Sequence, residues 1–481
     1  RGNSMNRRDF IKKMILSSAA AGSFNLFMPR LAMADIIPLS QNVLINLMLN
    51  GGCDTKYIFA PKPGSAYAEA YWEARKSLYS GFDQYDGPAG AYANEYIEVT
   101  DVSSGLQFGI HQTCQLLADA FNKGYAAIIA NSVCSTNRRH DQSQINVNVG
   151  DCDFDIINYE TAGWAGRLVE IIGNDATVVE VANEISLVCK GTDASDRLKN
   201  VIHARNTRDI ALPTVNNPNS ANERDIMTRA LSAYYAARGE EIAASGTDAK
   251  PANWPYHTFF NHYDSFRTFG ETITSRLDTC PLPTKLGVLS LNNNDFLQQC
   301  KNVYDTCFIQ DILKHRVISM SYDGWDTHND QENRIKRNLA DVFAPRGTGG
   351  LATLISDLNS VAPDTVDKLV FCCTTDFGRQ LNANGAYGTD HGRGLYSIIF
   401  GKNVQGGIYG EMFPQSEIDD LGGSVTPPMQ KPGSDITGLT SMERILSELV
   451  DWVQPGTGTN VFPDAASSIL EAGVSLDNLL A

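Results

Sequence analysis

The sequence predicts an α/β fold, with a doubly wound, mainly parallel sheet, helices on both of its faces and a helical insertion. Apolar runs of strand length recur along the chain, and helical patterns precede several of them. Runs that are apolar at nearly every position are typical of strands buried on both faces, as in parallel sheets. The alternation of such strands with helices favours the α/β class. The expected strands are 43–49, 126–130, 316–321, 368–373 and 396–400, and the expected helices are 113–123, 293–313 and 351–360.

One elaborated domain is expected over residues 35–481. This length exceeds a typical single domain, but the sequence contains no Pro-, Ser- or Gly-rich linker that would separate two cores and no internal repeat. Between about residues 191 and 292 the chain becomes polar and rich in asparagine. Helical patterns at 221–244 and 257–276 predict that this stretch is an insertion or cap over an edge of the sheet.

The first 34 residues have the features of a twin-arginine export signal. The pair Arg7 and Arg8 precedes a moderately apolar stretch at 14–28 and a small-residue cleavage site at 32–34. We therefore expect export by the twin-arginine translocase, cleavage after residue 34, and a periplasmic or secreted location. The apolar stretch is shorter than the roughly 20 residues that span a bilayer, so no stable membrane anchor is expected. All ten cysteines follow this segment, and an oxidising compartment would permit disulfides among them.

The chain without its signal is strongly acidic. The formal charge of -16 becomes -21 when residues 1–34 are removed, because they hold six basic residues and one acidic residue. Such a surface repels nucleic acid at long range, so no nucleic-acid partner is expected. Residues 1–4, which precede Met5, are expected to be extra residues that play no part in the fold.

Polar and acidic segments follow four of the expected strands, at 50–54, 131–141, 322–328 and 374–379. In open α/β sheets, ligands bind outside the carboxyl ends of the strands, so these four loops should meet at one edge. With the later segment 388–392 they hold three of the eight histidines, His140, His328 and His391, and six aspartates, Asp54, Asp141, Asp323, Asp326, Asp376 and Asp390. Carboxylates and imidazoles suit one or two divalent ions, of zinc, calcium, magnesium or manganese. The alternative for any single aspartate is a helix N-cap.

Several of these motifs resemble the domain-of-unknown-function 1501 family, a twin-arginine-exported family related to sulfatases and alkaline phosphatases. The resemblance is carried by Gly51-Gly52-Cys53-Asp54, Gly324-Trp325-Asp326-Thr327-His328, Asp376-Phe377-Gly378-Arg379, Gly388-Thr389-Asp390-His391-Gly392 and Tyr409-Gly410. It implies an alkaline-phosphatase-like fold, in which a two-metal centre and a hydroxyl nucleophile hydrolyse phosphate or sulfate esters.

The resemblance also implies a role for each matching residue. One metal would be bound by Asp54 and Asp376, and the other by Asp326, His328 and His391. Phe377 stands where a histidine commonly follows the acid, so the missing ligand would come from Asp390 or His140.

The candidate nucleophile lies in the segment 134–140, after an expected strand and at the expected start of a helix. A helix N-terminus there would stabilise developing negative charge. The stretch from Cys134 to Arg138 is similar to the sulfatase pattern in which a cysteine becomes formylglycine, but Thr136 occupies its Pro/Ala position. We therefore expect Ser135 or Thr136 to face the metals from the first turn of the helix, with His140 and Arg138 as further catalytic candidates.

Two functions are consistent with the sequence. The first is an exported metal-dependent hydrolase that takes a small anionic ester of phosphate or sulfate. Four arginines fall inside the motifs, Arg138, Arg139, Arg379 and Arg393. Guanidinium groups match phosphate and sulfate oxygens, unless these arginines pair with nearby aspartates. The second is a non-catalytic exported binding or assembly protein that keeps the hydrolase fold.

Overall fold

The computed structural model describes residues 39–80, 82–209, 254–416, 438–463 and 474–481, together with isolated positions between 230 and 244. The expected export signal and much of the expected insertion lie outside the described residues. Within the described ranges, no helix combines the length and hydrophobicity that crossing a bilayer requires.

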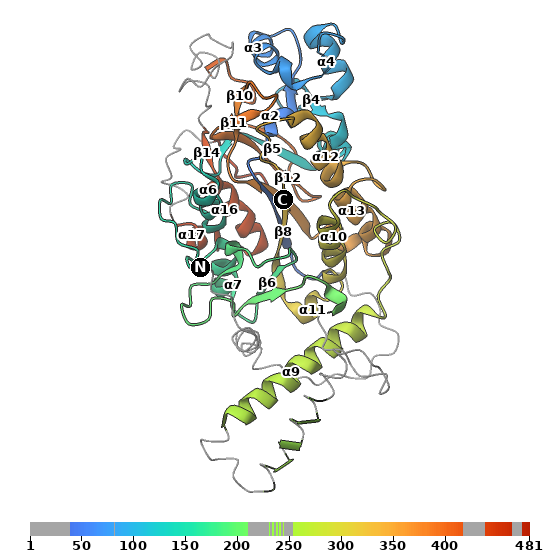
Figure 1. Cartoon of the computed structure of the whole chain (residues 1–481), viewed down its shortest axis with the longest axis vertical. Helices are drawn as coiled ribbons and strands as arrows, with labels where there is room; N and C mark the ends of the chain where they lie inside the picture. Colours follow the sequence, from blue (N-terminus) through green and yellow to red (C-terminus); the bar gives the residue numbers. More distant parts are fainter. Residues whose placement is uncertain are drawn as a thin grey trace.

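In the described part of the chain, nine strands form a central sheet (Figure 1). Their order is β13-β5-β12-β9-β1-β8-β6-β7, and β14 pairs with β5. Their bounds are β1 Val43–Asn50, β5 Ala126–Val133, β6 Thr177–Glu180, β7 Val201–His203, β8 His315–Asp323, β9 Leu369–Thr375, β12 Gly394–Phe400, β13 Gly407–Tyr409 and β14 Thr440–Ser441. All five expected strands are present in this sheet, which is largely parallel, as predicted. Strand β12 differs, because it runs antiparallel to both β5 and β9.

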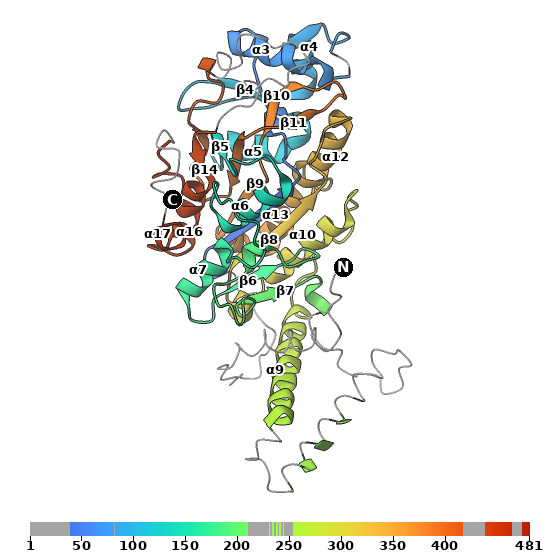
Figure 2. The same ribbon diagram turned by 60° about the vertical axis from the view of Figure 1, so that its left-hand side comes forward.

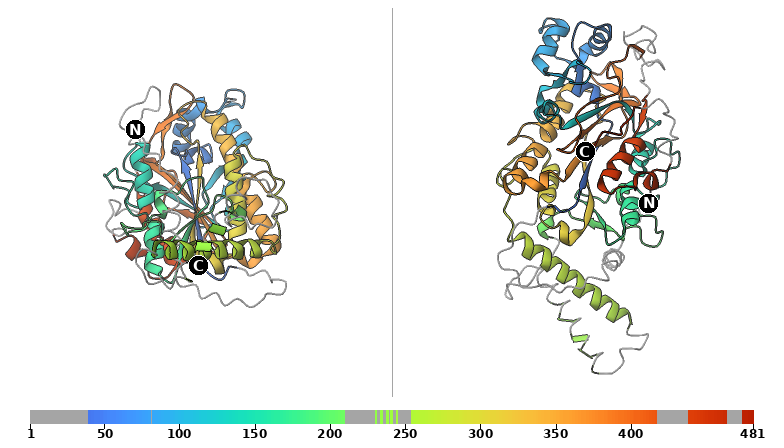
Figure 3. Two further views of the ribbon diagram at one scale, coloured as in Figure 1. Left: turned by 60° about the horizontal axis from the view of Figure 1, so that its bottom comes forward. Right: turned by 180° about the vertical axis from the view of Figure 1, so that it is seen from behind.

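Helices cover both faces of the sheet (Figures 1 and 3). Alternate residues of β1 enter different hydrophobic clusters: Ile45 and Leu47 lie in one, Leu44 and Met48 in the other. The first cluster includes side chains of α5 Gln115–Asn122, α10 Asn294–Thr306, α12 Gln331–Phe343 and α13 Gly350–Val361. The second includes side chains of α6 His140–Val149, α7 Trp164–Ile172, α16 Met442–Val453 and α17 Gly458–Val461. The strands are therefore apolar at successive positions because both faces are buried.

The helix expected over 293–313 is interrupted. Helix α10 ends at Thr306, and a separate short helix, α11, spans Gln310–Leu313. Between them, the backbone N–H groups of Phe308 and Ile309 bond carbonyls three residues earlier. These tighter turns break the α-helical ladder although the apolar spacing continues.

Two small sheets and a long helix lie outside the central sheet. A three-stranded antiparallel sheet comprises β2 Phe59–Pro61, β4 Gln107–His111 and β3 Tyr96–Thr100, near α2 Thr55–Ile58, α3 Ala66–Arg75 and α4 Gly87–Glu95. Strands β10 Arg379–Ala383 and β11 Thr389–His391 pair as a hairpin. The long helix α9 Trp254–Leu277 lies at the opposite end of the molecule from this hairpin (Figure 2).

The strand directions bring five loops to one edge of the sheet. Strand β1 is parallel to β8 and β9, and β12 is antiparallel to both β9 and β5, so β1, β5, β8 and β9 all point the same way. Because β12 runs the other way, it begins where these four strands end, and Gly394 pairs with Val133. The segment that enters β12 from β11 therefore joins the four loops that follow the parallel strands.

Candidate metal centre

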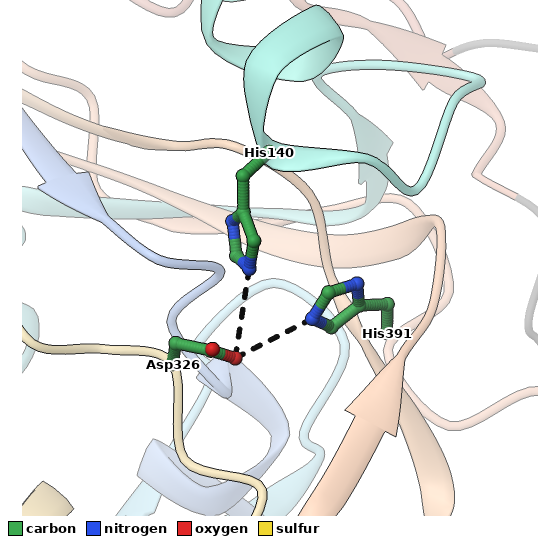
Figure 4. Close-up of side chains that lie close together, drawn as sticks. All are labelled: His140, Asp326 and His391. Carbon is green, nitrogen blue, oxygen red and sulfur yellow. Dashed lines mark hydrogen bonds and ion pairs between the residues drawn. The ribbon is translucent and has the colours of Figure 1, made fainter.

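Three of the predicted site residues meet at this edge. His140, Asp326 and His391 offer ligand atoms that all lie within 4.8 Å of one another (Figure 4). His140 is the first residue of α6, Asp326 lies in the loop after β8, and His391 ends β11. The Asp326 Oδ1 atom is 3.6 Å from His140 Nε2 and 3.4 Å from His391 Nε2. The chain thus gathers these three side chains from positions up to 251 residues apart, as the numbering shows.

Both imidazole rings of this trio are fixed by their other nitrogen atom. His140 Nδ1 lies 2.7 Å from Asp376 Oδ2, and His391 Nδ1 lies 2.7 Å from the carbonyl oxygen of Arg138. A carbonyl or carboxylate oxygen accepts hydrogen bonds, so each Nδ1 carries the proton in the neutral ring. Each Nε2 then presents a lone pair toward Asp326. Metal-binding histidines are held in this way by carboxylate and carbonyl partners.

A third imidazole adjoins the trio. His328 Nε2 lies 3.2 Å from Asp326 Oδ1 and 2.8 Å from His391 Nε2. On its other side, His328 Nδ1 lies 3.0 Å from Asp390 Oδ1. The sequence predicts Asp326 and His328 as ligands of one metal; their side chains lie side by side, but His328 stands outside the trio.

Charge and burial favour an ionised carboxylate at the centre. Partial burial opposes the ionisation of Asp326, but the Arg379 guanidinium, 2.7 Å from its Oδ1 atom, lowers the pKa of Asp326 to about 2. The hydrogen bond to Asp376 raises the pKa of His140. Burial lowers the pKa of His391, and the nearby Arg379 acts in the same direction. At neutral pH, Asp326 is therefore an anion.

Phe377 occupies the side of the centre where the resemblance would place a histidine. Its buried ring lies with its centroid 4.8 Å from that of His140 and 4.4 Å from that of His391. A Cβ atom at Gly52 would lie 2.6 Å from this ring. Phe377 therefore packs against the two imidazoles, and Gly52 leaves the space that its ring requires.

Gly51 lets the loop after β1 approach the loop of Asp326. Its φ angle is 117°, and a Cβ atom there would lie 2.5 Å from the backbone nitrogen of Asp326. Such a backbone conformation favours glycine, and the contact leaves no room for a side chain. Gly51, in the predicted Gly-Gly motif, thus lets the loop after β1 lie close to Asp326 because it has no side chain.

Asp54, an expected metal ligand, is engaged elsewhere. Its two carboxylate oxygens accept from Arg75 at 2.8 and 3.1 Å, and Gln331 donates to it at 2.7 Å. Burial opposes the ionisation of Asp54, yet the neighbouring Arg75 lowers its pKa. Asp54 and Arg75 form a fully buried ion pair beside the centre. Neither Arg75 nor Gln331 could be predicted as a partner of Asp54, because neither lies in a recognisable motif.

Asp376 and Asp390 lie behind the histidines rather than beside Asp326. Asp376 is completely buried and accepts from the Gly51 N–H group at 3.1 Å, in addition to its contact with His140. Asp390 accepts from Asn384 at 3.1 Å and contacts His328. Both carboxylates therefore orient imidazole rings.

The expected nucleophile segment does not open a helix at Ser135 or Thr136. Helix α6 begins at His140. The Ser135 hydroxyl is buried and accepts from the Asn137 N–H group and the Asn146 amide, and the Thr136 hydroxyl contacts Asp153 at 2.8 Å. The expectation that one of them faces the metals from the first helical turn is wrong, because these bonds hold the residues in a loop before the helix. Burial raises the pKa of the Cys134 thiol.

The motif arginines Arg139 and Arg379 pair with aspartates. Arg139 contacts Asp141 at 2.6 Å on the surface. Arg379 is buried and donates to Asp326 and to the carbonyl oxygens of Gly51 and Gly52. The pairing alternative is thus confirmed for both. Arg138 contributes its carbonyl oxygen to the centre, and the residue is exposed.

All ten cysteines are free in the structure, and nine of them are buried. They pack as small apolar side chains.

Residues 313–423 match the model of a family described as "Protein of unknown function (DUF1501)". The matched segment supports the resemblance drawn from the motifs. It runs from the end of α11 past β13 and contains Asp326, His328, Asp376 and His391. Asp54 and His140 precede the segment. No curated protein matches the chain.

His140 has two alternative roles in the sequence analysis, as a catalytic residue and as the replacement for a missing metal ligand. Its ring stands opposite His391 across Asp326, a position that agrees with the role of ligand. The sequence pattern that indicates the role of His140 is a strand followed by a polar loop and a histidine. The same pattern follows β8, where the histidine is His328.

Proposed function

We propose that this protein is an exported metal-dependent hydrolase with an alkaline-phosphatase-like fold, and that His140, Asp326 and His391 bind its metal ion. Phosphate and sulfate esters are the substrate class that the family resemblance favours. The observation that carries the proposal is the convergence of two acceptor nitrogens on one ionised carboxylate.

The donor set fits a divalent ion. Within the described residues, the Nε2 atom of His140 is buried and has no hydrogen-bond partner. With His391 Nε2 and Asp326 Oδ1 it makes an electron-rich site, which a cation would satisfy. Two imidazoles and one carboxylate are typical of zinc and of other transition metals.

The site is open enough for a reaction. The side chains of Asp326, His140 and His391 are 44, 32 and 22% exposed. Three protein ligands with solvent access leave a coordination position for substrate, as in catalytic rather than structural metal sites. A divalent ion held there would supply Lewis-acid polarisation of the ester.

Other residues of the site would orient the metal ligands and transfer protons. Asp376 and the Arg138 carbonyl orient the ligand rings, and Arg379 holds Asp326 in place. We assign acid–base chemistry to His328 Nε2, because its ring is 40% exposed and its Nδ1 atom is fixed by Asp390. In ester hydrolysis, His328 Nε2 would take a proton from water as the water attacks, and would return it to the leaving oxygen.

Water is the attacking group that we favour. The hydroxyls of Ser135 and Thr136 are bonded within their own loop, as described above. The same observation favours a second candidate, a non-catalytic binding protein that keeps the metal site.

Turnover and metal content together test the proposal. Wild-type protein, His391→Ala, His328→Ala and the control His203→Ala would be assayed with aryl phosphate and aryl sulfate after loading with zinc or manganese. His203 lies exposed on the edge strand β7, away from the trio. We expect His391→Ala to lose metal and turnover, His328→Ala to lose turnover alone, and His203→Ala to keep both. Stoichiometric metal with no turnover of any ester would favour the binding protein.

A further inference from the structure

A second feature of the same edge is a pocket of about 630 Å³. It is lined by residues from β1, β6 and β8, from the loop after β6, from one side of α6 and from the start of α10, together with Tyr159. This volume lies in the range of small-molecule binding sites. The pocket adjoins the metal centre, because Gln144 lines it and donates to Asp376 Oδ2 at 3.3 Å. That oxygen also contacts His140.

Amide side chains dominate the pocket. They are Asn46, Asn50, Gln144, Asn148, Asn183, Asn293 and Gln299. An amide can donate and accept hydrogen bonds at once, as a hydroxyl group does. Among the described residues, no lysine or arginine lines this pocket. The lining therefore lacks the cations that recognise a phosphate or sulfate group.

Three of the four carboxylates of the pocket, Asp323, Asp295 and Glu180, are already engaged, and the fourth, Glu184, is exposed. Asp323 accepts from Asn50 at 2.7 Å, and Asp295 accepts from Asn183 at 2.7 Å. Glu180 is fully buried and accepts from the Ser186 hydroxyl at 2.6 Å. Burial raises the pKa of Glu180, which favours its uncharged form. These bonds reduce the attraction of the pocket for a free cation.

We propose that this pocket binds an uncharged, hydroxyl-rich group, a sugar or polyol unit. The assignment of this group to the substrate rests on the proposed function. The metal centre would bind the reacting ester group, and the amide-lined pocket would bind the sugar or polyol that carries it. Tyr159, a residue that is 55% exposed, lines the pocket and offers an aromatic face to the C–H groups of a sugar ring.

Binding would be measured by calorimetry with wild-type protein in metal-loaded and metal-depleted forms. The probes are cellobiose, maltose, chitobiose and myo-inositol, with spermidine and inorganic sulfate as charged comparators. We expect at least one neutral probe to bind both forms, and neither charged compound to displace it. Binding of no neutral probe, or displacement by spermidine or sulfate, would overturn the proposal.

Asn148→Leu tests the pocket directly. Asn148 lies on α6 and donates to the carbonyl of Gln144 at 2.6 Å, whereas Asn94 on α4 donates to the carbonyl of Gly90 at 2.7 Å outside the pocket. The control Asn94→Leu removes the same local bond. We expect Asn148→Leu to weaken sugar binding about tenfold, the effect of one lost hydrogen bond, and Asn94→Leu to leave it unchanged. Asn183 lies exposed at the rim of the pocket, so Asn183→Ala provides a second test if Asn148→Leu fails to fold. We expect Asn183→Ala to weaken sugar binding by the same factor.

The two proposals can fail separately. Sugar binding that persists in metal-depleted protein, together with no ester turnover, would contradict the proposed function and leave the pocket assignment standing. Ester turnover without any sugar binding, or equal binding by Asn148→Leu, Asn183→Ala and Asn94→Leu, would contradict the pocket assignment alone.

Discussion

The Nδ1 atom of His140 lies 2.7 Å from the Oδ2 atom of Asp376, a carboxylate with no exposed surface. This contact joins the start of α6 to the loop after β9 and turns His140 Nε2 toward Asp326. The other oxygen of Asp376 accepts from the Gly51 N–H group. One buried carboxylate thus links three of the loops that form the centre.

Asp376→Asn is therefore expected to weaken metal binding about 10- to 100-fold, because the ligand ring loses the charge that orients it. Competition with a chromophoric chelator would measure the affinity. Asp357→Asn is the matched control, since this buried carboxylate accepts from Lys285 and Leu286 N–H groups elsewhere in the fold. Equal metal affinities for the two variants would refute an orienting role for Asp376.

The buried pair of Asp54 and Arg75 makes a prediction about stability. Arg75→Met leaves the Asp54 carboxylate buried without its partner, which should cost about 3–5 kcal/mol in the free energy of unfolding. Urea denaturation would measure this cost, and metal content is expected to stay unchanged. Wild-type stability of the variant would contradict the prediction that Asp54 depends on Arg75 for its charge balance.

His315 predicts part of the pH dependence of stability. Burial lowers its pKa to about 3, and neither ring nitrogen has a hydrogen-bond partner among the described residues. Between pH 6.5 and 3 the unfolded chain binds the proton and the folded chain does not, so stability is fully present above pH 6.5 and falls as the pH drops. We expect a loss of about 2 kcal/mol from this group between pH 6.5 and 5.

The variant His315→Leu should remove that component. Urea unfolding of both proteins at pH 7, 6 and 5 would give the difference, in which the other titrating groups cancel. Parallel pH profiles for wild type and variant would contradict the assignment.

The close approach of Gly51 to the Asp326 backbone predicts that a substitution at Gly51 weakens metal binding. Gly51→Ala should weaken metal binding, because the new Cβ atom would displace the Asp326 backbone, and should destabilise the fold by about 1–3 kcal/mol. Gly64→Ala controls for backbone strain alone, since Gly64 has a φ angle of 120° and nothing within 4 Å of its Cβ position. Metal affinity is expected to fall only in the first variant. An equal effect in both would show that contact with Asp326 is irrelevant.

The central strands were predictable because burial on both faces makes them apolar at nearly every position. The same runs say nothing about direction, so the antiparallel course of β12 could not be foreseen. That reversal has a consequence for the site, since it brings the β11 segment and His391 to the edge where the parallel strands end.

The site residues were predictable as a set but not in their individual relations. Residue types after strands indicated a metal site, and His140, Asp326 and His391 do meet. Which carboxylate orients and which one faces the centre depends on contacts such as that of His140 with Asp376, 236 residues away.

The start of α6 was misjudged for a local reason. The hydroxyl of Ser135 and the amide of Asn137 accept from backbone N–H groups two residues later. Such turns compete with the helix and delay its start to His140.

The metal content of the protein tests the central claim most directly. Wild-type protein and the double variant His140→Ala/His391→Ala, both purified from the native compartment, would be measured by inductively coupled plasma mass spectrometry before and after equilibration with zinc and manganese. We predict about one ion per chain in the wild type and almost none in the variant. A wild type that stays metal-free after equilibration, or a double variant that binds as much metal as the wild type, would contradict the assignment of this centre.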